Sequence, residues 1–254
     1  FNIGITGHSG SLGGTIKRYK SRHKYFFFKG DIRDKKKLFY WFKKNKLDVI
    51  FHLASVVGVN RYMEDPLSLI DTAINGTKTL IELCQVNQVR MLFTSTSEVY
   101  GRNKEIPWSE GFDRVLGPTN VDRWSYSTAK ALCEHMLFGV HHNSSWPMSI
   151  IRFFNVYGPR QNPIYVVSKS IYSIMNGIPP ELYDGGKQTR CFTYIEDVVE
   201  GIILSATKEE ALGQVINLGN PVEVSMKEVM DIILRETSSD LSYTNIKTQD
   251  KYGE

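Results

Sequence analysis

The chain has 254 residues, of which 41% are hydrophobic, enough to build the core of one large domain or of a domain with a smaller lobe. Its net charge of +4 is mild, and its lysines between Lys17 and Lys46 are scattered among aromatic and acidic residues. This favours a solvated face over a nucleic-acid-binding surface. No run of about 18 apolar residues predicts a membrane-spanning helix, and the strand-like start does not read as a signal peptide. We therefore expect a cytoplasmic protein with no nucleic-acid or membrane partner.

Cys84, Cys133 and Cys191 lie far apart in apolar stretches, which favours reduced, buried thiols. His141-His142 lies in a polar segment that reads as a solvated loop, with no carboxylate or cysteine at ligand spacing. No metal is expected.

The first predicted element is a short buried strand at residues 3–6, followed by Gly7, Gly10 and Gly13 and by a helix from about Thr15. A dinucleotide-binding turn needs glycine where the backbone bends and where a pyrophosphate approaches, and the helix N-terminus then binds that pyrophosphate. The spacing is one residue looser than the common Gly-x-Gly-x-x-Gly fingerprint, so this interpretation depends on the position between strand and helix.

Strands and helices then alternate. Further buried strands are predicted at residues 25–28, 49–53, 91–95 and 148–152, with amphipathic helices at 35–45 and 67–86. Such alternation predicts an α/β fold with a doubly wound parallel sheet. Because ligands of such sheets bind at the carboxyl ends of the strands, we expect the segments 52–55, 95–98 and 153–155 at the binding edge.

Tyr126 and Lys130 are four residues apart in a stretch that suits a helix. This spacing places the phenol and the ammonium side by side, and the positive charge lowers the pKa of the phenol, so that Tyr126 becomes a usable base. The same spacing also occurs by chance in many helices.

After residue 156 we predict a helix, a strand pair within residues 181–194, a second helix and a final helix with Ser225 as its N-cap. We expect residues 1–155 to form the dinucleotide-binding domain. Residues 156–254 are expected to form mostly a smaller substrate-binding lobe that is interleaved with this core.

Together these motifs resemble the extended short-chain dehydrogenases/reductases of the NAD-dependent epimerase/dehydratase family, which act on nucleotide sugars. The matching segments are the glycine loop and residues 30–34, 52–55, 76–77, 94–101, 126–130, 152–160, 184–197 and 217–220. The resemblance implies a Rossmann-like fold with a smaller C-terminal lobe, NAD as cofactor and a nucleotide-diphosphate sugar, most simply a UDP-sugar, as substrate. It also implies a homodimer through the helices at 67–86 and 129–140.

The resemblance assigns chemistry to four residues. Tyr126 would take the proton from a sugar hydroxyl, usually at C4, while hydride passes to the nicotinamide. Lys130 would hold the nicotinamide ribose, and Thr96 would hydrogen-bond the same sugar oxygen.

Glu98 bears on the type of reaction. The triplet Thr96-Ser97-Glu98 is similar to those of UDP-glucuronate decarboxylases and GDP-mannose 4,6-dehydratases, whereas plain 4-epimerases typically lack this acid. The expected function is an NAD-dependent epimerase or dehydratase that acts through a transient keto sugar with no net redox change. A decarboxylase-like enzyme, a structural role for Glu98 and a non-catalytic NAD-binding scaffold remain open.

The resemblance also implies the binding residues. Those for the cofactor are Gly7, Ser9, Gly10, Ser11, Leu12, Gly13, Asp31, Ile32, Leu53, Ala54, Ser55, Tyr126, Lys130 and Phe153. Those for the substrate are Ser97, Asn155 and Arg190, whose guanidinium fork suits a diphosphate. The alternative for Arg190 is a surface arginine on a strand.

Three features depart from the family pattern. Only one strand fits before Gly30-Asp31, so Asp31 is expected at the adenine, and NAD rather than NADP follows from the family alone. Ala73 stands where relatives carry Asn, so a polar contact behind the active site is expected to be absent. Relatives continue past Glu254 with a strand, an arginine-bearing loop and a closing helix, so the substrate lobe is expected to be incomplete.

Overall fold

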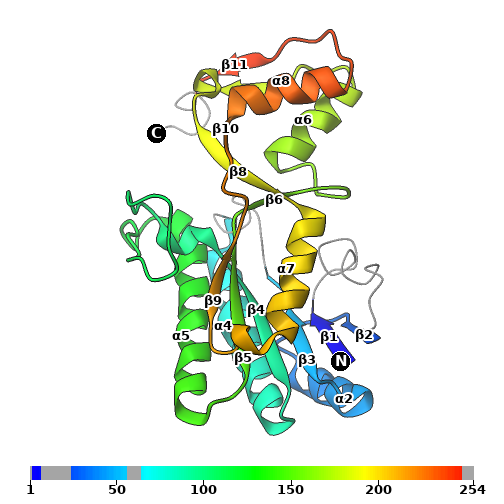
Figure 1. Cartoon of the computed structure of the whole chain (residues 1–254), viewed down its shortest axis with the longest axis vertical. Helices are drawn as coiled ribbons and strands as arrows, with labels where there is room; N and C mark the ends of the chain where they lie inside the picture. The colour runs from blue at the N-terminus through cyan, green and yellow to red at the C-terminus, as the bar shows by residue number, and fades with distance from the viewer. Residues whose placement is uncertain (1, 7–23, 56–63, 248–254) are drawn as a thin grey trace. The chain divides into compact units, whose positions relative to one another are not determined.

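The structure is a computed structural model, and it describes residues 2–6, 24–55 and 64–247. The chain divides into two compact units (Figure 1). The first unit spans Phe1–Phe153 and Val199–Leu218, and the second spans Phe154–Val198 and Gly219–Glu254. Neither unit is therefore one continuous stretch of sequence. The predicted glycine loop and the helix predicted from Thr15 lie outside the described residues.

The first unit is built on a parallel sheet, whose described strands follow the order β2-β1-β3-β4-β5-β9. These strands are β1 (Asn2–Thr6), β2 (Lys24–Phe28), β3 (Val49–His52), β4 (Arg90–Thr96), β5 (Met148–Phe153) and β9 (Val215–Leu218). The doubly wound α/β prediction is confirmed. A further strand, β9, was not predicted from the sequence and pairs with β5.

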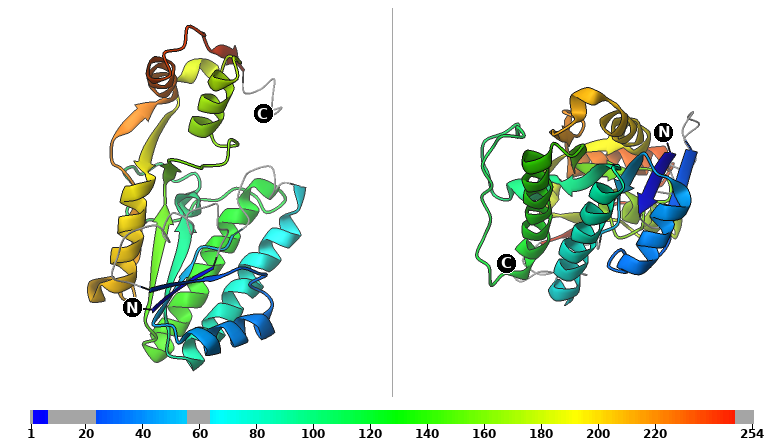
Figure 2. Two further views of the ribbon diagram at one scale, coloured as in Figure 1. Left: turned by 90° about the vertical axis from the view of Figure 1, so that its right-hand side faces the viewer. Right: turned by 90° about the horizontal axis from the view of Figure 1, so that it is seen from below.

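Helices cover both faces of this sheet (Figure 2). They are α2 (Lys35–Asn45), α4 (Pro66–Val86) and α5 (Ser125–Ser144) on one face, and α7 (Ile195–Thr207) on the other. The Asp34 side chain caps α2 by accepting from the Lys37 N–H, and Asp65 caps α4 by accepting from the Ser68 N–H. The predicted bounds of α2 are confirmed.

The core of the first unit lies between the sheet and the helices α2, α4 and α5. Every residue of β3 and β4 is buried, as expected for central strands of a parallel sheet that is covered on both faces. Apolar side chains of these strands, such as Phe93, pack with Leu80 of α4 and Leu137 of α5 in one cluster. This packing holds α5 close to the strands that carry the candidate site.

The second unit contains two small sheets and two helices among its described residues. One sheet has the order β10-β8-β6, and the other pairs β11 with β7. The elements are β6 (Asn155–Tyr157), α6 (Val166–Met175), β7 (Glu181–Tyr183), β8 (Thr189–Tyr194), β10 (Glu223–Ser225), α8 (Met226–Glu236) and β11 (Thr244–Ile246). Ile174 of α6 packs against Val229 and Ile233 of α8.

The predicted N-cap of α8 is confirmed. The Ser225 hydroxyl accepts from the Glu228 N–H at 3.1 Å, and the Glu228 carboxylate accepts from the Ser225 N–H at 2.8 Å. This reciprocal capping box satisfies two backbone donors that the helix itself leaves unpaired.

The predicted pairing of the strands within residues 181–194 is wrong. β7 pairs with β11, and β8 pairs with β6 and β10. The turn between them explains the difference, because Asp184, Gly185 and Gly186 all have positive φ angles and redirect the chain. A Cβ at Gly186 would lie 2.7 Å from the Lys227 backbone nitrogen, so this position requires glycine.

Two smaller expectations also changed. His141 and His142 lie in the last turn of α5 rather than in a loop, where basic side chains complement the helix dipole. Cys84 and Cys133 are buried as predicted, but Cys191 is only partly buried.

None of the described helices combines the length and the apolar composition that crossing a membrane would require.

Candidate active site

Thr96 ends β4 at the carboxyl edge of the parallel sheet. Its Oγ1 accepts a hydrogen bond from the Glu98 N–H at 3.2 Å and thereby caps the short 3-10 helix formed by residues 97–100. Ser97 and Glu98 are partly buried in this turn. The strand and the turn together fix the three residues that the sequence singled out.

Tyr126 lies in the first turn of α5 and packs, partly buried, in a small cluster with Ala129 of its own helix. Leu69, Ala73 and Ile74 of α4 complete this cluster. The resemblance led us to expect that Ala73 removes a polar contact behind the active site. In the structure, Ala73 packs in the apolar cluster that contains Tyr126.

Lys130 follows one turn later and is 97% buried, since its relative exposure is 3%. Its Nζ donates to the Thr94 carbonyl oxygen at 2.7 Å and lies 4.7 Å from the centroid of the Phe93 ring. The predicted helix thus brings its lysine to the strand that ends at Thr96. Tyr126 lies one turn earlier on the same helix, so its phenol and the Lys130 ammonium share one helix face.

Burial lowers the pKa of Lys130 to about 8, although the Cys133 thiol and the Glu134 carboxylate oppose this change. At neutral pH the side chain keeps its charge. A buried positive charge thus lies one turn after Tyr126 on the same helix.

His52, the last residue of β3, lies close to Lys130 but is held neutral. Burial, and to a smaller extent the charge of Lys130, lowers the pKa of His52 to about 3. Its ring nitrogens lie 3.1 Å from Thr6 Oγ1 and 3.0 Å from Thr77 Oγ1. His52 therefore ties β1, β3 and α4 together rather than supplying a charged group.

A buried ion pair fixes the rotation of α5. Arg152 of β5 donates to both oxygens of Glu134, at 3.0 Å and 2.6 Å, and Ser95 of β4 donates to the same carboxylate. Arg152 also donates to the Tyr100 hydroxyl at 2.8 Å, and that hydroxyl donates to Asn217 of β9 at 2.8 Å. Glu134 lies one turn after Lys130, so this network sets where Lys130 and Tyr126 point.

Glu98 is held by a second ion pair. Arg123, just before α5, places its Nη1 2.5 Å from Glu98 Oε2, and its guanidinium lies 5.8 Å from the Trp124 ring centroid. This partner was not predicted from the sequence, because Arg123 lies outside the motifs that carry the family resemblance. The nearest available signal was its position three residues before Tyr126.

The cofactor residues that the structure describes lie at the same edge of the sheet. Asp31 and Ile32 follow β2, Leu53 to Ser55 follow β3, and Phe153 ends β5. Ile32 is buried against Gly76 of α4, where any Cβ would clash with its side chain. The loop residues Gly7, Ser9, Gly10, Ser11, Leu12 and Gly13 lie outside the described residues.

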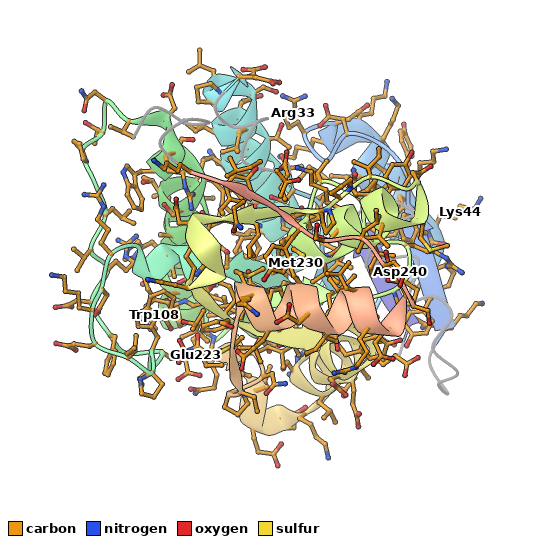
Figure 3. The ribbon with its side chains drawn as sticks, turned by 90° about the horizontal axis from the view of Figure 1, so that it is seen from above. Arg33, Lys44, Trp108, Glu223, Met230 and Asp240 are labelled. Atoms are coloured by element: carbon orange, nitrogen blue, oxygen red, sulfur yellow. The ribbon has the colours of Figure 1, made fainter. Side chains whose placement is uncertain are left out.

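The second unit has a pocket of about 320 Å³. Asn155, Arg190 and Lys169 supply polar groups to its lining, and Tyr183, Phe192 and Met230 supply apolar ones; Figure 3 labels Met230 on α8. Arg190 donates to the Thr189 carbonyl oxygen at 2.6 Å, and Asn155 donates to the Cys191 carbonyl oxygen at 3.4 Å. The two substrate residues predicted in this unit thus line one pocket.

No group of three or more His, Cys, Asp or Glu side chains among the described residues has a geometry that would hold a metal ion.

Comparison with known families decides the classification. A family model described as GDP-mannose 4,6 dehydratase matches residues 6–252, nearly the whole chain. The chain belongs to the GDP-mannose 4,6-dehydratase family. This family model spans both units, from β1 past β11.

Curated relatives of this family member carry out different reactions. The chain is 37% identical over 211 residues to a UDP-N-acetyl-alpha-D-glucosaminuronate decarboxylase of Bacillus cytotoxicus, covering 82% of this chain and 65% of the relative. It is 32% identical over 218 residues to a dTDP-D-glucose 4,6-dehydratase of Dictyostelium discoideum, covering 82% and 49%. The chain therefore spans 65% of the length of the first relative and 49% of the length of the second.

A solved structure adds a third reaction. The chain is similar to the UDP-N-acetylglucosamine 4-epimerase of Methanobrevibacter ruminantium in complex with UDP-N-acetylmuramic acid, with 27% identity and a TM-score of 0.85. The match covers 97% of this chain and 85% of that protein. Proteins named as a decarboxylase, a dehydratase and an epimerase are thus all similar to this chain.

The lowered pKa of Lys130 makes a prediction about stability. The unfolded chain keeps the proton of Lys130 up to its ordinary pKa of 10.5, whereas the folded chain releases it above about 8. Between these values the unfolded state binds more protons, so the free energy of unfolding rises with pH, by up to about 1.4 kcal/mol per pH unit from this residue.

Urea unfolding at a series of pH values from 7 to 10.5 tests it. We expect the Lys130→Met variant to lack this rise and the exposed-site variant Lys44→Met to keep it. Equal slopes in wild type and Lys130→Met would contradict the assigned pKa.

Proposed function

We propose that the chain carries out the chemistry of an NAD-dependent nucleotide-sugar enzyme. It oxidises the sugar, at C4, to a transient keto intermediate and reduces it again, with no net redox change. The observation that carries this proposal is the buried ammonium of Lys130, held against the strand of Thr96 by the helix that bears Tyr126. Membership of an NAD-dependent family supports it.

The described residues of the first unit fit NAD, and we propose residues 1–155 as its main binding region. The Lys130 ammonium has three donors, and within the described part of the chain its hydrogen-bond acceptor is the Thr94 carbonyl oxygen. Two donors thus remain for the hydroxyls of a ribose. Asp31, Ile32, Leu53, Ala54, Ser55 and Phe153 surround the same carboxyl edge, where sheets of this kind bind dinucleotides.

Bound NAD supplies reversible hydride transfer. The residues of the chain handle the proton: Tyr126 accepts it from the sugar hydroxyl, and Thr96 donates a hydrogen bond to the same oxygen. The charge of Lys130, one turn further along the same helix, stabilises the negative charge that Tyr126 develops when it loses its own proton. When the keto sugar is reduced, Tyr126 returns the proton.

We infer that the pocket of the second unit receives the nucleotide diphosphate of the substrate. Arg190 presents a planar guanidinium that suits paired phosphate oxygens, and Asn155 adds an amide. Lys169 is held by Glu181 at 2.6 Å, which leaves Arg190 as the better phosphate ligand. The M. ruminantium epimerase binds a UDP-sugar derivative, which supports a UDP-sugar as the substrate class.

A decarboxylase-like reaction is the second candidate. The relative from B. cytotoxicus decarboxylates a nucleotide-linked uronic acid, as its name says. The Glu98–Arg123 ion pair also favours this candidate, because Arg123 fixes the position of the Glu98 carboxylate at 2.5 Å, as a role in orienting groups requires.

The assignment of Tyr126 predicts a large loss of turnover on removal of one hydroxyl. Tyr126→Phe should lower kcat by about a hundredfold or more, because general base catalysis contributes about 10²- to 10⁴-fold. NAD affinity and the thermal unfolding temperature should stay near those of wild type. Steady-state kinetics on a panel of UDP-, GDP-, CDP- and dTDP-sugars, with NAD binding measured separately, provides the test.

The exposed tyrosine of α6 gives a matched control, since Tyr172→Phe removes the same hydroxyl from a side chain that is not among the residues lining the pocket of the second unit. Activity of Tyr126→Phe within threefold of wild type would refute the catalytic role. A wild-type protein that binds NAD but turns over no sugar in the panel would favour the scaffold alternative.

Glu98→Gln separates the reaction types. A dehydratase needs Glu98 to remove the C5 proton, so the variant should accumulate reduced cofactor with bound 4-keto sugar and lose solvent deuterium incorporation at C5. An epimerase should slow only modestly, and a decarboxylase should slow through lost positioning of groups around Arg123. Mass spectrometry of the product in D₂O distinguishes these outcomes, and unchanged rates would leave Glu98 a structural acid.

We also propose a homodimer. Besides the apolar residues that pack inside the first unit, α4 exposes Leu67 and Ile70, and α5 exposes Leu132. Two such helices from each copy can pack into a four-helix interface. The alternative is that both helices only cover the sheet of their own chain.

Light scattering at micromolar concentration tests the dimer. Wild type should have twice the mass of the chain, and Leu67→Glu with Leu132→Glu should shift it towards the monomer, because buried charges destabilise an apolar interface. Val222→Glu, at an exposed position of the second unit, is the control. A monomeric wild type would contradict the proposal.

A further inference from the structure

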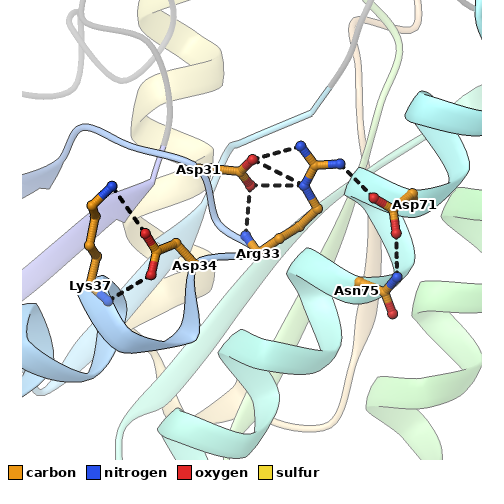
Figure 4. A network of polar contacts seen from close by, with 6 residues as sticks. All are labelled: Asp31, Arg33, Asp34, Lys37, Asp71 and Asn75. Carbon is orange, nitrogen blue, oxygen red and sulfur yellow. Dashed lines mark hydrogen bonds and ion pairs between the residues drawn. The ribbon is translucent and has the colours of Figure 1, made fainter.

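Arg33 links two carboxylates at the carboxyl end of β2 (Figure 4). Its Nε lies 3.0 Å from Asp31 Oδ1 and its Nη2 lies 2.6 Å from Asp31 Oδ2, while its backbone N–H donates to the same carboxylate at 2.8 Å. Its Nη1 lies 2.5 Å from Asp71 Oδ2 in α4. The planar guanidinium is thus held from both sides.

The second carboxylate is itself held in place. Asn75, one turn further along α4, donates to Asp71 Oδ1. Asp71 therefore accepts from Asn75 with one oxygen and from Arg33 with the other. The network connects the β2–α2 turn to α4 by side chains alone.

All three groups of the network are charged. Hydrogen bonds to Arg33 lower the pKa of Asp31 and of Asp71, and the two carboxylates raise the pKa of Arg33. One positive and two negative charges leave one excess negative charge at this place. Asp34 and Lys37 beside it form a neutral pair.

The network lies after β2, in the part of the sheet where dinucleotide-binding proteins distinguish NAD from NADP. In dinucleotide-binding sheets, an acid after the strand that pairs with the first strand accepts the 2′-hydroxyl of the adenosine ribose, whereas an arginine there accommodates the 2′-phosphate of NADP. The family motif led us to expect Asp31 at the adenine, but β2 pairs directly with β1 and so takes the place of that strand. Arg33 is two residues past Asp31, so it is the cation placed to meet that phosphate. Its donors, however, already bind Asp31 and Asp71.

We propose that Asp71 is a cofactor-specificity residue, which holds Arg33 against Asp31 and so withholds from NADP the cation that its 2′-phosphate needs. This rests on the proposed function in that NAD binds at this edge. Asp71 excludes NADP in two ways. It occupies a guanidinium nitrogen, and it supplies the negative charge that repels a phosphate.

Asp71→Asn tests the proposal, because the amide keeps the size of the side chain and a hydrogen-bonding partner for Asn75 but removes the charge. NAD and NADP affinities of the full chain are measured by calorimetric titration without sugar. We expect the ratio of NADP to NAD affinity to rise roughly fivefold or more, with NAD affinity itself changed less than threefold. The gain should disappear in Arg33→Ala combined with Asp71→Asn.

Glu82→Gln is the matched control, since it removes one acid from the same helix where the partner is Lys35 at 2.6 Å. An unchanged affinity ratio in Asp71→Asn would overturn the proposal, and so would an equal rise in Glu82→Gln, which would point to net charge alone. A wild type that binds NAD while Asp71→Asn shows no change leaves the proposed function standing. A wild type that binds no NAD removes both proposals.

Discussion

The ion pair between Glu134 and Arg152 is the constraint on which the candidate site depends. Moving two such charges out of water costs several kcal/mol each, about as much as a domain's whole stability when nothing compensates. Here the bidentate contact, Ser95, the Tyr100 hydroxyl and the Glu110 carbonyl oxygen compensate it. The pair has few alternative geometries, so α5 has few alternative rotations against β4 and β5. The positions of Tyr126 and Lys130, which lie on that helix, are restricted in the same way.

Hydrogen bonds also compensate the burial of two further polar side chains. Lys130 lies one turn before Glu134 and finds its acceptor on the backbone of β4, while His52 finds two threonine hydroxyls. Lys130 keeps its charge at neutral pH, and His52 stays neutral beside it. Burial lowers the pKa of both side chains, but only the lysine ends near neutral pH with its proton in place.

Local patterns predicted much of this molecule. The bounds of α2, the cap of α8 and the parallel sheet of the central strands were predicted from the sequence, because each depends on neighbours in sequence or on hydrophobic periodicity. The pairing of β7 with β11 and the addition of β9 to the main sheet were not, since long-range pairing leaves no local signal. The Tyr126 and Lys130 pair came from helical spacing, but the partners Arg152 and Arg123 were found only in three dimensions.

The route of the chain has a consequence for synthesis on the ribosome. The first unit cannot close its sheet until β9 emerges, and β9 follows the excursion of Phe154–Val198 into the second unit. Until then the Tyr100 hydroxyl lacks Asn217, and the edge of β5 is open for pairing with another chain. A nascent chain of this kind exposes the incomplete core of the first unit for longer than a chain whose sheet closes in sequence order, so we expect its folding intermediates to be prone to aggregation.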